Sequence, residues 1–107
     1  MVKIKVPQKI KIATHEYRVE FNPLIRHEEN LTGSANHLRQ RIQVDPLIAP
    51  SQKLVTLLHE VNHVISDVYS CKLGEDEIDK MAQGFAELLA DNFNLQFDWS
   101  DIKELSL

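Results

Sequence analysis

The hydrophobic period of this chain changes once, near its middle. Before about residue 45, apolar and polar residues alternate at the period of a β-strand over residues 2–6, 9–12, 17–21 and 39–44. From Ser51 onward, apolar residues recur every three or four positions, which is the period of an α-helix. Strands followed by helices are typical of the α+β class. Because the chain has 107 residues, we expect one domain over residues 1–107.

The strand half predicts a small N-terminal sheet of three to four strands, antiparallel or mixed. Each strand would bury one face, as the 39–44 segment illustrates with Ile42 and Val44 on one side and Arg41 on the other. Residues 22–37 contain Asn-Pro and Thr-Gly-Ser, so we expect a surface connection there, with a short helical turn around residues 24–29.

The helical half predicts two helices, at about 51–69 and 75–92. The first would begin at Ser51 as N-cap and carry one apolar stripe, formed by Leu54, Leu57, Leu58, Val61, Ile65 and Val68. The second would place Ile78, Met81, Ala82, Phe85, Leu88 and Leu89 on its stripe. Residues 97–102 would add a last helical turn capped by Ser100 or Asp98. The sheet is expected to pack on both helices.

Composition and charge exclude several classes of protein. No apolar run approaches the ~18 residues of a membrane helix, and the N-terminus lacks the apolar core of a signal peptide, so we expect a cytosolic protein that does not bind membranes. Residues 1–50 carry eight Lys and Arg against five Asp and Glu, but these cations are dispersed, which indicates no nucleic-acid partner. The single cysteine, Cys71, excludes an internal disulfide and a multi-cysteine zinc cluster.

Residues 59–63 read His-Glu-Val-Asn-His, an H-E-x-x-H motif, in the middle of the first predicted helix. On a helix, residues four apart lie one turn above each other, so His59 and His63 can reach one metal ion. Glu60 is rotated by about 100° from His59, which lets its carboxylate act beside the metal as a general base. Random placement of the chain's histidines and glutamates would give this string in about 2% of such sequences. The motif therefore indicates a Zn²⁺ site.

A third ligand is expected from the second helix, and Glu77 is the preferred candidate. It shares a strip with Met81, Gly84 and Leu88 at the border of the apolar stripe, so it would point toward the first helix. A short hairpin would also bring Glu77 near the level of His63. Asp76 and Asp79 are the competitors. A set of three protein ligands plus an open position favours a catalytic zinc over a structural one.

Four further polar residues are candidates for supporting roles. Asp67 lies one turn beyond His63 on the same face, where it would accept the second ring N–H of a zinc-bound histidine and orient it. Tyr69, His37 and Asn36 are candidate donors to a tetrahedral oxyanion.

The chain resembles the small zincin-type metallopeptidases related to the ImmA/IrrE family in three places: the segment 56–65, the strand 41–45 before it and residues 77–82 after it. In size it is similar to the short forms encoded by phages and prophages. The resemblance spans roughly residues 33–92. It implies a minimal zincin-like fold in which His59, His63 and Glu77 bind Zn²⁺ and Glu60 is the catalytic base. Longer relatives cleave DNA-binding repressors, some with a helix-turn-helix segment that this chain lacks.

The implied function is zinc-dependent hydrolysis of a protein or peptide substrate, which would pair with the sheet edge near residues 39–44. The alternative is a catalytically silent zinc-binding module that binds or inhibits a host protein. A metal-free interaction domain is the third hypothesis.

Overall fold

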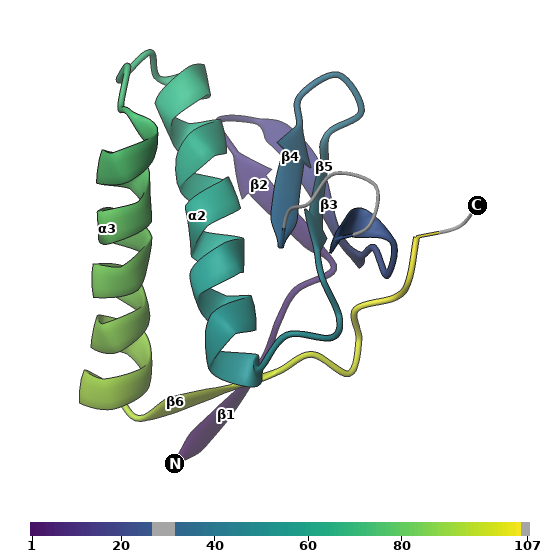
Figure 1. Ribbon diagram of the computed structural model, residues 1–107, viewed down its shortest axis with the longest axis vertical. Helices are drawn as coiled ribbons and strands as arrows, with labels where there is room; N and C mark the ends of the chain where they lie inside the picture. The colour runs from purple at the N-terminus through teal and green to yellow at the C-terminus, as the bar shows by residue number, and fades with distance from the viewer. Residues whose placement is uncertain (27–31, 106–107) are drawn as a thin grey trace.

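The computed structural model describes residues 1–26 and 32–105, and within them the predicted α+β class is confirmed. Two sheets and a pair of helices make up these residues, arranged in layers (Figure 1). The second half of the helical turn expected at 24–29 lies outside the described residues. Its first half is present, because the chain turns at residues 23–24 and enters helical conformation at Ile25 and Arg26.

The larger sheet is mixed and has the strand order β2-β3-β5-β4. It contains β2 (Lys9–Ile12), β3 (His15–Phe21), β4 (Gly33–Asn36) and β5 (Arg41–Val44). β3 is antiparallel to β2 and parallel to β5, and β4 is antiparallel to β5. The alternation in β5 is as expected, because Ile42 and Val44 are completely buried.

β4 corrects the expected surface connection over residues 22–37. Its sequence, Gly-Ser-Ala-Asn, lacks the bulky alternating residues that mark a strand. The backbone of β5 nevertheless supplies a complete partner, with Gly33 opposite Val44 and Asn36 opposite Arg41. Pairing with an established neighbour therefore decides the conformation here, and side-chain propensity does not.

The smaller sheet joins the two ends of the described chain. β1 (Val2–Lys5) runs parallel to β6 (Leu95–Asp98), with Val2 opposite Leu95. β1 thus lies outside the N-terminal sheet in which it was expected, and the expected helical turn at 97–102 is wrong. Asp98 instead ends β6 and accepts the backbone N–H of Ser100 in a turn.

The two helices form their own layers on one face of the larger sheet. α2 (Pro50–Val68) lies between that sheet and α3 (Glu75–Glu87), as Figure 1 shows, and the π-helical turn η1 (Leu88–Asn92) follows α3. Because α2 is covered on two sides, it buries more than one stripe: Val64 is completely buried, and the polar residues Glu60 and Ser66 are only 9% and 5% exposed. Polar as well as apolar side chains of this helix therefore lie between the layers, although Asp67 near its end remains 62% exposed.

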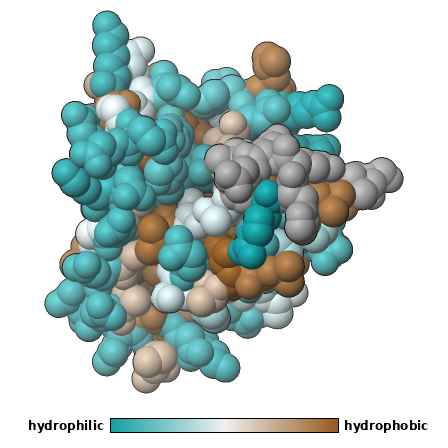
Figure 2. All heavy atoms as spheres, viewed as in Figure 1, coloured by the Kyte–Doolittle hydropathy of each residue, from teal (hydrophilic) through white to brown (hydrophobic). Residues whose placement is uncertain are grey.

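Apolar side chains from the larger sheet, from α2 and from the segments that follow β1 and β6 meet in one cluster, formed by Val6, Ile12, Tyr17, Val19, Ile42, Leu57, Val64 and Ile102. Trp99 packs against this cluster and stacks on Phe21, with ring centroids 5.8 Å apart. On the face drawn in Figure 2, hydrophilic side chains cover most of the upper part over the helix pair, and most of the visible apolar residues lie lower down, although one apolar side chain projects at the top right. Among the described residues, no helix combines the length and apolar character needed to cross a bilayer.

Candidate metal centre

The helix α2 places the two motif histidines one above the other. Their ring centroids are 4.9 Å apart, and their Nε2 atoms approach to 3.1 Å. Both side chains are largely buried, with 17% of His59 and 30% of His63 exposed. The motif thus presents two imidazole nitrogens to one point beside the helix.

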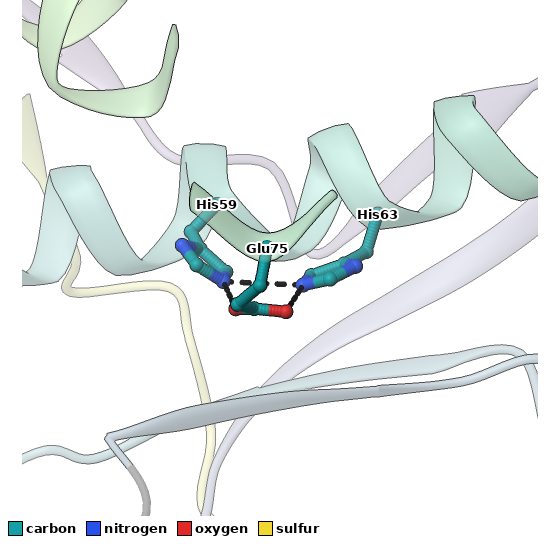
Figure 3. Close-up of side chains that lie close together, drawn as sticks. All are labelled: His59, His63 and Glu75. Atoms are coloured by element: carbon teal, nitrogen blue, oxygen red, sulfur yellow. Dashed lines mark hydrogen bonds and ion pairs between the residues drawn. The ribbon is translucent and has the colours of Figure 1, made fainter. Parts of the chain in front are cut away.

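Glu75, the first residue of α3, brings a carboxylate to the same point (Figure 3). Its Oε1 lies 2.5 Å from Nε2 of His59, and its Oε2 lies 2.9 Å from Nε2 of His63. Helical side chains tilt toward the helix N-terminus, so the first residue of α3 can reach back across the hairpin to α2. Ser66 holds this hairpin, because its buried hydroxyl accepts the backbone N–H of Leu73.

These three side chains fit the requirements of a zinc ion. Two imidazoles and a carboxylate are the ligand set of many catalytic zinc sites. Zn–N bonds of about 2.05 Å in tetrahedral geometry place two ligand nitrogens about 3.3 Å apart. The observed 3.1 Å between the histidine Nε2 atoms is close to that separation. The Glu75 oxygens lie 2.5 and 2.9 Å from these nitrogens, closer than that separation, so the exposed Glu75 side chain would move slightly outward when an ion binds between the three groups.

Charge within this cluster favours an ionised carboxylate at Glu75. Burial opposes ionisation of Glu75, but its hydrogen bonds with His63 and His59 outweigh this effect and lower the pKa of the carboxyl. Glu75 is also 70% exposed at its side chain, so the site is open to solvent on that side.

Glu60 lies beside the cluster in a different environment. Its side chain is 9% exposed, and burial raises the pKa of its carboxyl, whereas the neighbouring His59 and His63 act to lower it. The close approach of β4 contributes to this burial: a Cβ added at Gly33 would overlap Cγ2 of Thr56 and would lie 3.3 Å from Cγ of Glu60. Glycine at the start of β4 thus lets the strand pack directly against α2 next to the motif.

A cleft of about 510 Å³ runs between β4 and the two helices and contains the whole cluster. The floor is formed by α2, and one wall by Gly33, Ser34 and Ala35 of β4. His37, Asp67 and Asp79 also line this cleft. The candidate metal centre is therefore accessible to a ligand in solution.

Glu77 is not brought to the histidines, and Glu75 replaces it in the candidate ligand set. The Glu77 carboxylate accepts the backbone N–H of Gly74 at 3.2 Å, which caps the start of α3. Of the two competitors, Asp76 is exposed and pairs with Lys80. Asp79 lies 3.5 Å from Nδ1 of His59, the ring nitrogen that faces away from the cluster.

Asp67 contacts neither motif histidine. Its Oδ2 lies 2.5 Å from Nε2 of His37, and the hydroxyl of Tyr17 lies 3.0 Å from Nδ1 of the same ring. The expected role of Asp67 as an orienter of a metal-binding histidine therefore has no contact to support it, and Asp79 is better placed for that role at His59. Tyr69 and Asn36 do not line the cleft, so His37 alone remains of the three candidate oxyanion donors.

The importance of Glu75 was missed because the buried side of α3 was misjudged. The residues buried on this helix are Ile78, Ala82 and Ala86, and Glu75 continues their strip at three- and four-residue spacing. The strip of Glu77 is rotated about half a turn away, and its Met81 and Leu88 are 39% and 41% exposed. The sequence does contain a signal for the correct strip, because the small residues Ala82 and Ala86 permit close contact between helices. The large apolar side chains of Met81 and Leu88 led instead to the prediction of the strip that contains Glu77.

Comparison with known proteins found no similar protein. No protein-family profile matches the chain, and neither a curated protein nor a solved structure is significantly similar to it.

Proposed function

We propose that this chain is a zinc-dependent metallopeptidase of the H-E-x-x-H type, in which His59, His63 and Glu75 hold one Zn²⁺. The observation that carries the proposal is the convergence of these three side chains in an open cleft, with Glu60 buried beside them. The bound ion would supply a Lewis acid that polarises the scissile carbonyl and lowers the pKa of water. The minimal zincin-like arrangement belongs to the same proposal.

Glu60 is the general base of this mechanism. It follows His59 directly in the sequence and lines the cleft, so its carboxylate can take a proton from the attacking water and return it to the leaving amine. Burial raises the pKa of the carboxyl, which strengthens it as a base relative to an exposed glutamate.

Extended peptide would bind along β4. β5 was the expected docking edge, but it has β3 on one side and β4 on the other, so its backbone groups are already paired. β4 is the last strand of the sheet on the cleft side, and Ser34 and Ala35 lie in the cleft wall. Backbone hydrogen bonds to this edge would lay a substrate across the metal centre.

A Glu60→Gln variant tests the proposal. We expect purified wild-type protein and the variant to contain about one zinc per chain, and hydrolysis of an unfolded protein substrate to fall by about 10²-fold or more in the variant. Glu16→Gln, at an exposed position on β3, is the matched control and should leave hydrolysis unchanged.

Two results would contradict the proposal. One is a Glu60→Gln variant that hydrolyses the substrate at the wild-type rate. The other is a His59→Ala, His63→Ala double variant that retains its zinc. Wild-type protein that holds zinc and hydrolyses no substrate would favour the alternative, a zinc-binding module that acts on a partner protein without turnover.

A further inference from the structure

Three of the four arginines of the chain come together on the face of the larger sheet that points away from α2. Arg18, Arg39 and Arg41 line one hollow there, which has a volume of about 240 Å³ and is completed by Lys9, Glu16 and Gln40. In the sequence these cations are dispersed. The fold therefore creates a basic site that the order of the residues does not reveal.

The register of the strands explains why these side chains share a face. Lys9 lies opposite Arg18 across β2 and β3, and Arg18 lies opposite Arg41 across β3 and β5. Side chains directly opposite each other point to the same face of a sheet. The next residues, Val19 and Ile42, point to the other face, where they join the core with α2. A row of three cations therefore crosses three neighbouring strands.

Two carboxylates lie near this row and neutralise it in part. Lys9 is 4.0 Å from Glu16, and Arg41 is 3.6 Å from Glu20. Both distances exceed the ~2.8 Å of a charge-assisted hydrogen bond, so these contacts leave N–H groups of both cations available to a ligand.

The other two cations of the hollow have no such partner. Within residues 1–26 and 32–105, neither Arg18 nor Arg39 forms an ion pair. The side chains that line the hollow thus comprise four cations and one carboxylate, a net charge of 4 − 1 = +3. Like charges directly opposite each other destabilise a sheet. A bound anion would relieve this repulsion.

A second hollow, of about 390 Å³, borders the same row and is also lined by Lys9, Arg18 and Arg41. It gains a fourth cation from Lys103, but two glutamates line it as well, so its charge is less positive. The charged end of a ligand therefore fits the smaller hollow, and the larger one leaves room for the remainder.

The chemistry of the smaller hollow suits phosphate groups. A guanidinium can bind phosphate oxygens through two parallel N–H bonds. One phosphate carries a charge of about −1.5 to −2 at pH 7, so two linked phosphates match the hollow's charge of +3. Nucleic acid fits less well. None of the described residues that line the hollow is aromatic and able to stack on a base, and the chain's net charge of −4 repels an extended polyanion.

We propose that this hollow binds a compact anion with two or more linked phosphate groups. Arg18, at the centre of the row, and Arg39 are the residues on which binding depends most, because neither has an ion pair within the described part of the chain. The hollow shares no lining residue with the cleft of the candidate metal centre, so the inference does not depend on the proposed peptidase function.

Titration with inorganic pyrophosphate, followed by calorimetry at about 0.1 M ionic strength, tests the proposal. We expect one pyrophosphate to bind per chain, with a Kd at least about tenfold higher in Arg18→Gln, Arg39→Gln. Lys3→Gln, Lys72→Gln removes the same charge from exposed positions outside the hollow and is the matched control. Its Kd should stay within about twofold of the wild type, because distant charges are screened at this ionic strength.

A further variant separates this site from the metal centre, since phosphate oxygens can also bind a zinc ion. His59→Ala, His63→Ala should bind pyrophosphate with the wild-type Kd. Loss of binding in this variant would assign the anion to the metal centre and overturn the proposal.

Thermal denaturation of Arg18→Gln gives a readout that a purely structural role would not. Without anion, the variant should have a higher Tm than the wild type, because the repulsion within the row is reduced. With saturating pyrophosphate the order should reverse, since the wild type gains more from the bound anion. A Tm difference that is the same with and without pyrophosphate would contradict the proposal.

Three other results would overturn it. The first is wild-type protein that does not bind pyrophosphate, and the second is an equal Kd in Arg18→Gln, Arg39→Gln and its control. The third is an oligothymidylate or a triglutamate peptide that binds more tightly than pyrophosphate and loses this affinity in Arg18→Gln, Arg39→Gln, which would assign the hollow to nucleic acid or to an acidic protein segment.

Discussion

Two glutamates in the first turn of α3, only two positions apart, have opposite roles. Glu75 reaches across the hairpin to His59 and His63, whereas Glu77 turns back to cap its own helix at Gly74. Successive helical residues are rotated by about 100°, so two positions move a side chain about 200° around the axis. In a helical hairpin, the side of the helix on which a carboxylate lies therefore decides whether it can bind a metal ion shared with the other helix. Its distance along the sequence does not decide this.

The largest difference between these two glutamates is expected in zinc binding when each is replaced by alanine. Loss of an outer-shell partner weakens metal binding by 10- to 100-fold, so Glu75→Ala, which would remove a direct ligand of the proposed zinc ion, should raise the zinc Kd by at least about 100-fold. Glu77→Ala should leave it within about twofold, because the cap does not contact the metal centre. Competition with a chromogenic chelator measures both. Equal losses in the two variants would show that the carboxylates act only through the charge of the helix terminus.

The strips on which these two glutamates lie should also differ in stability. Ile78 continues the strip of Glu75 and is 1% exposed, so Ile78→Ala should lower the free energy of unfolding by about 2–3 kcal/mol. Met81 continues the strip of Glu77 and is 39% exposed, so Met81→Ala should cost less than about 1 kcal/mol. Urea denaturation of the metal-free proteins tests this. A larger loss for Met81→Ala would reverse the assignment of the buried side.

A third carboxylate, that of Asp79, tests the difference between a metal ligand and a residue that orients a ligand. Asp79 lies one turn beyond Glu75 and 3.5 Å from Nδ1 of His59, so it can orient that ring without touching the metal ion. We expect Asp79→Asn to raise the zinc Kd by about tenfold, between the effects at Glu75 and Glu77. Asp76→Asn, at the exposed position that pairs with Lys80, is the control and should leave zinc binding unchanged.

The smallest effect is expected from the cap itself. Glu77→Ala removes the acceptor of the Gly74 N–H and should lower the free energy of unfolding by about 0.5–1 kcal/mol. Glu77→Gln keeps an acceptor oxygen and should recover most of this loss. Thermal denaturation of the two variants side by side measures the difference, and an equal loss in both would assign the effect to the charge of Glu77.

The sequence was sufficient for the features that depend on local periodicity. The helix 50–68, the strand 41–44 and the class of the fold follow from apolar spacing, and the H-E-x-x-H spacing predicts that His59 and His63 lie together. Each of these features depends on residues that are close together in the sequence, so the spacing of apolar residues is enough to predict it.

The features that the sequence did not predict depend on contacts between residues that are far apart in the chain. β4 forms because β5 offers a free edge, and the pairing of β1 is decided by β6, which lies at the other end of the described residues. The role of Glu75 depends on which side of α3 packs on α2, and the exposed Met81 and Leu88 concealed that side. Contacts of this kind are set by packing, which apolar spacing alone does not specify.

The pairing of β1 with β6 has a consequence for the order in which the molecule is assembled. Gln8 donates a hydrogen bond to the carbonyl oxygen of Asp101, 93 positions later, whereas His59 and Glu75 are 16 positions apart. Closing a long loop costs more entropy than closing a short one, so contacts between distant residues form later. During synthesis the helical hairpin leaves the ribosome before β6 does. The three proposed zinc ligands can therefore come together before β1 has paired with β6.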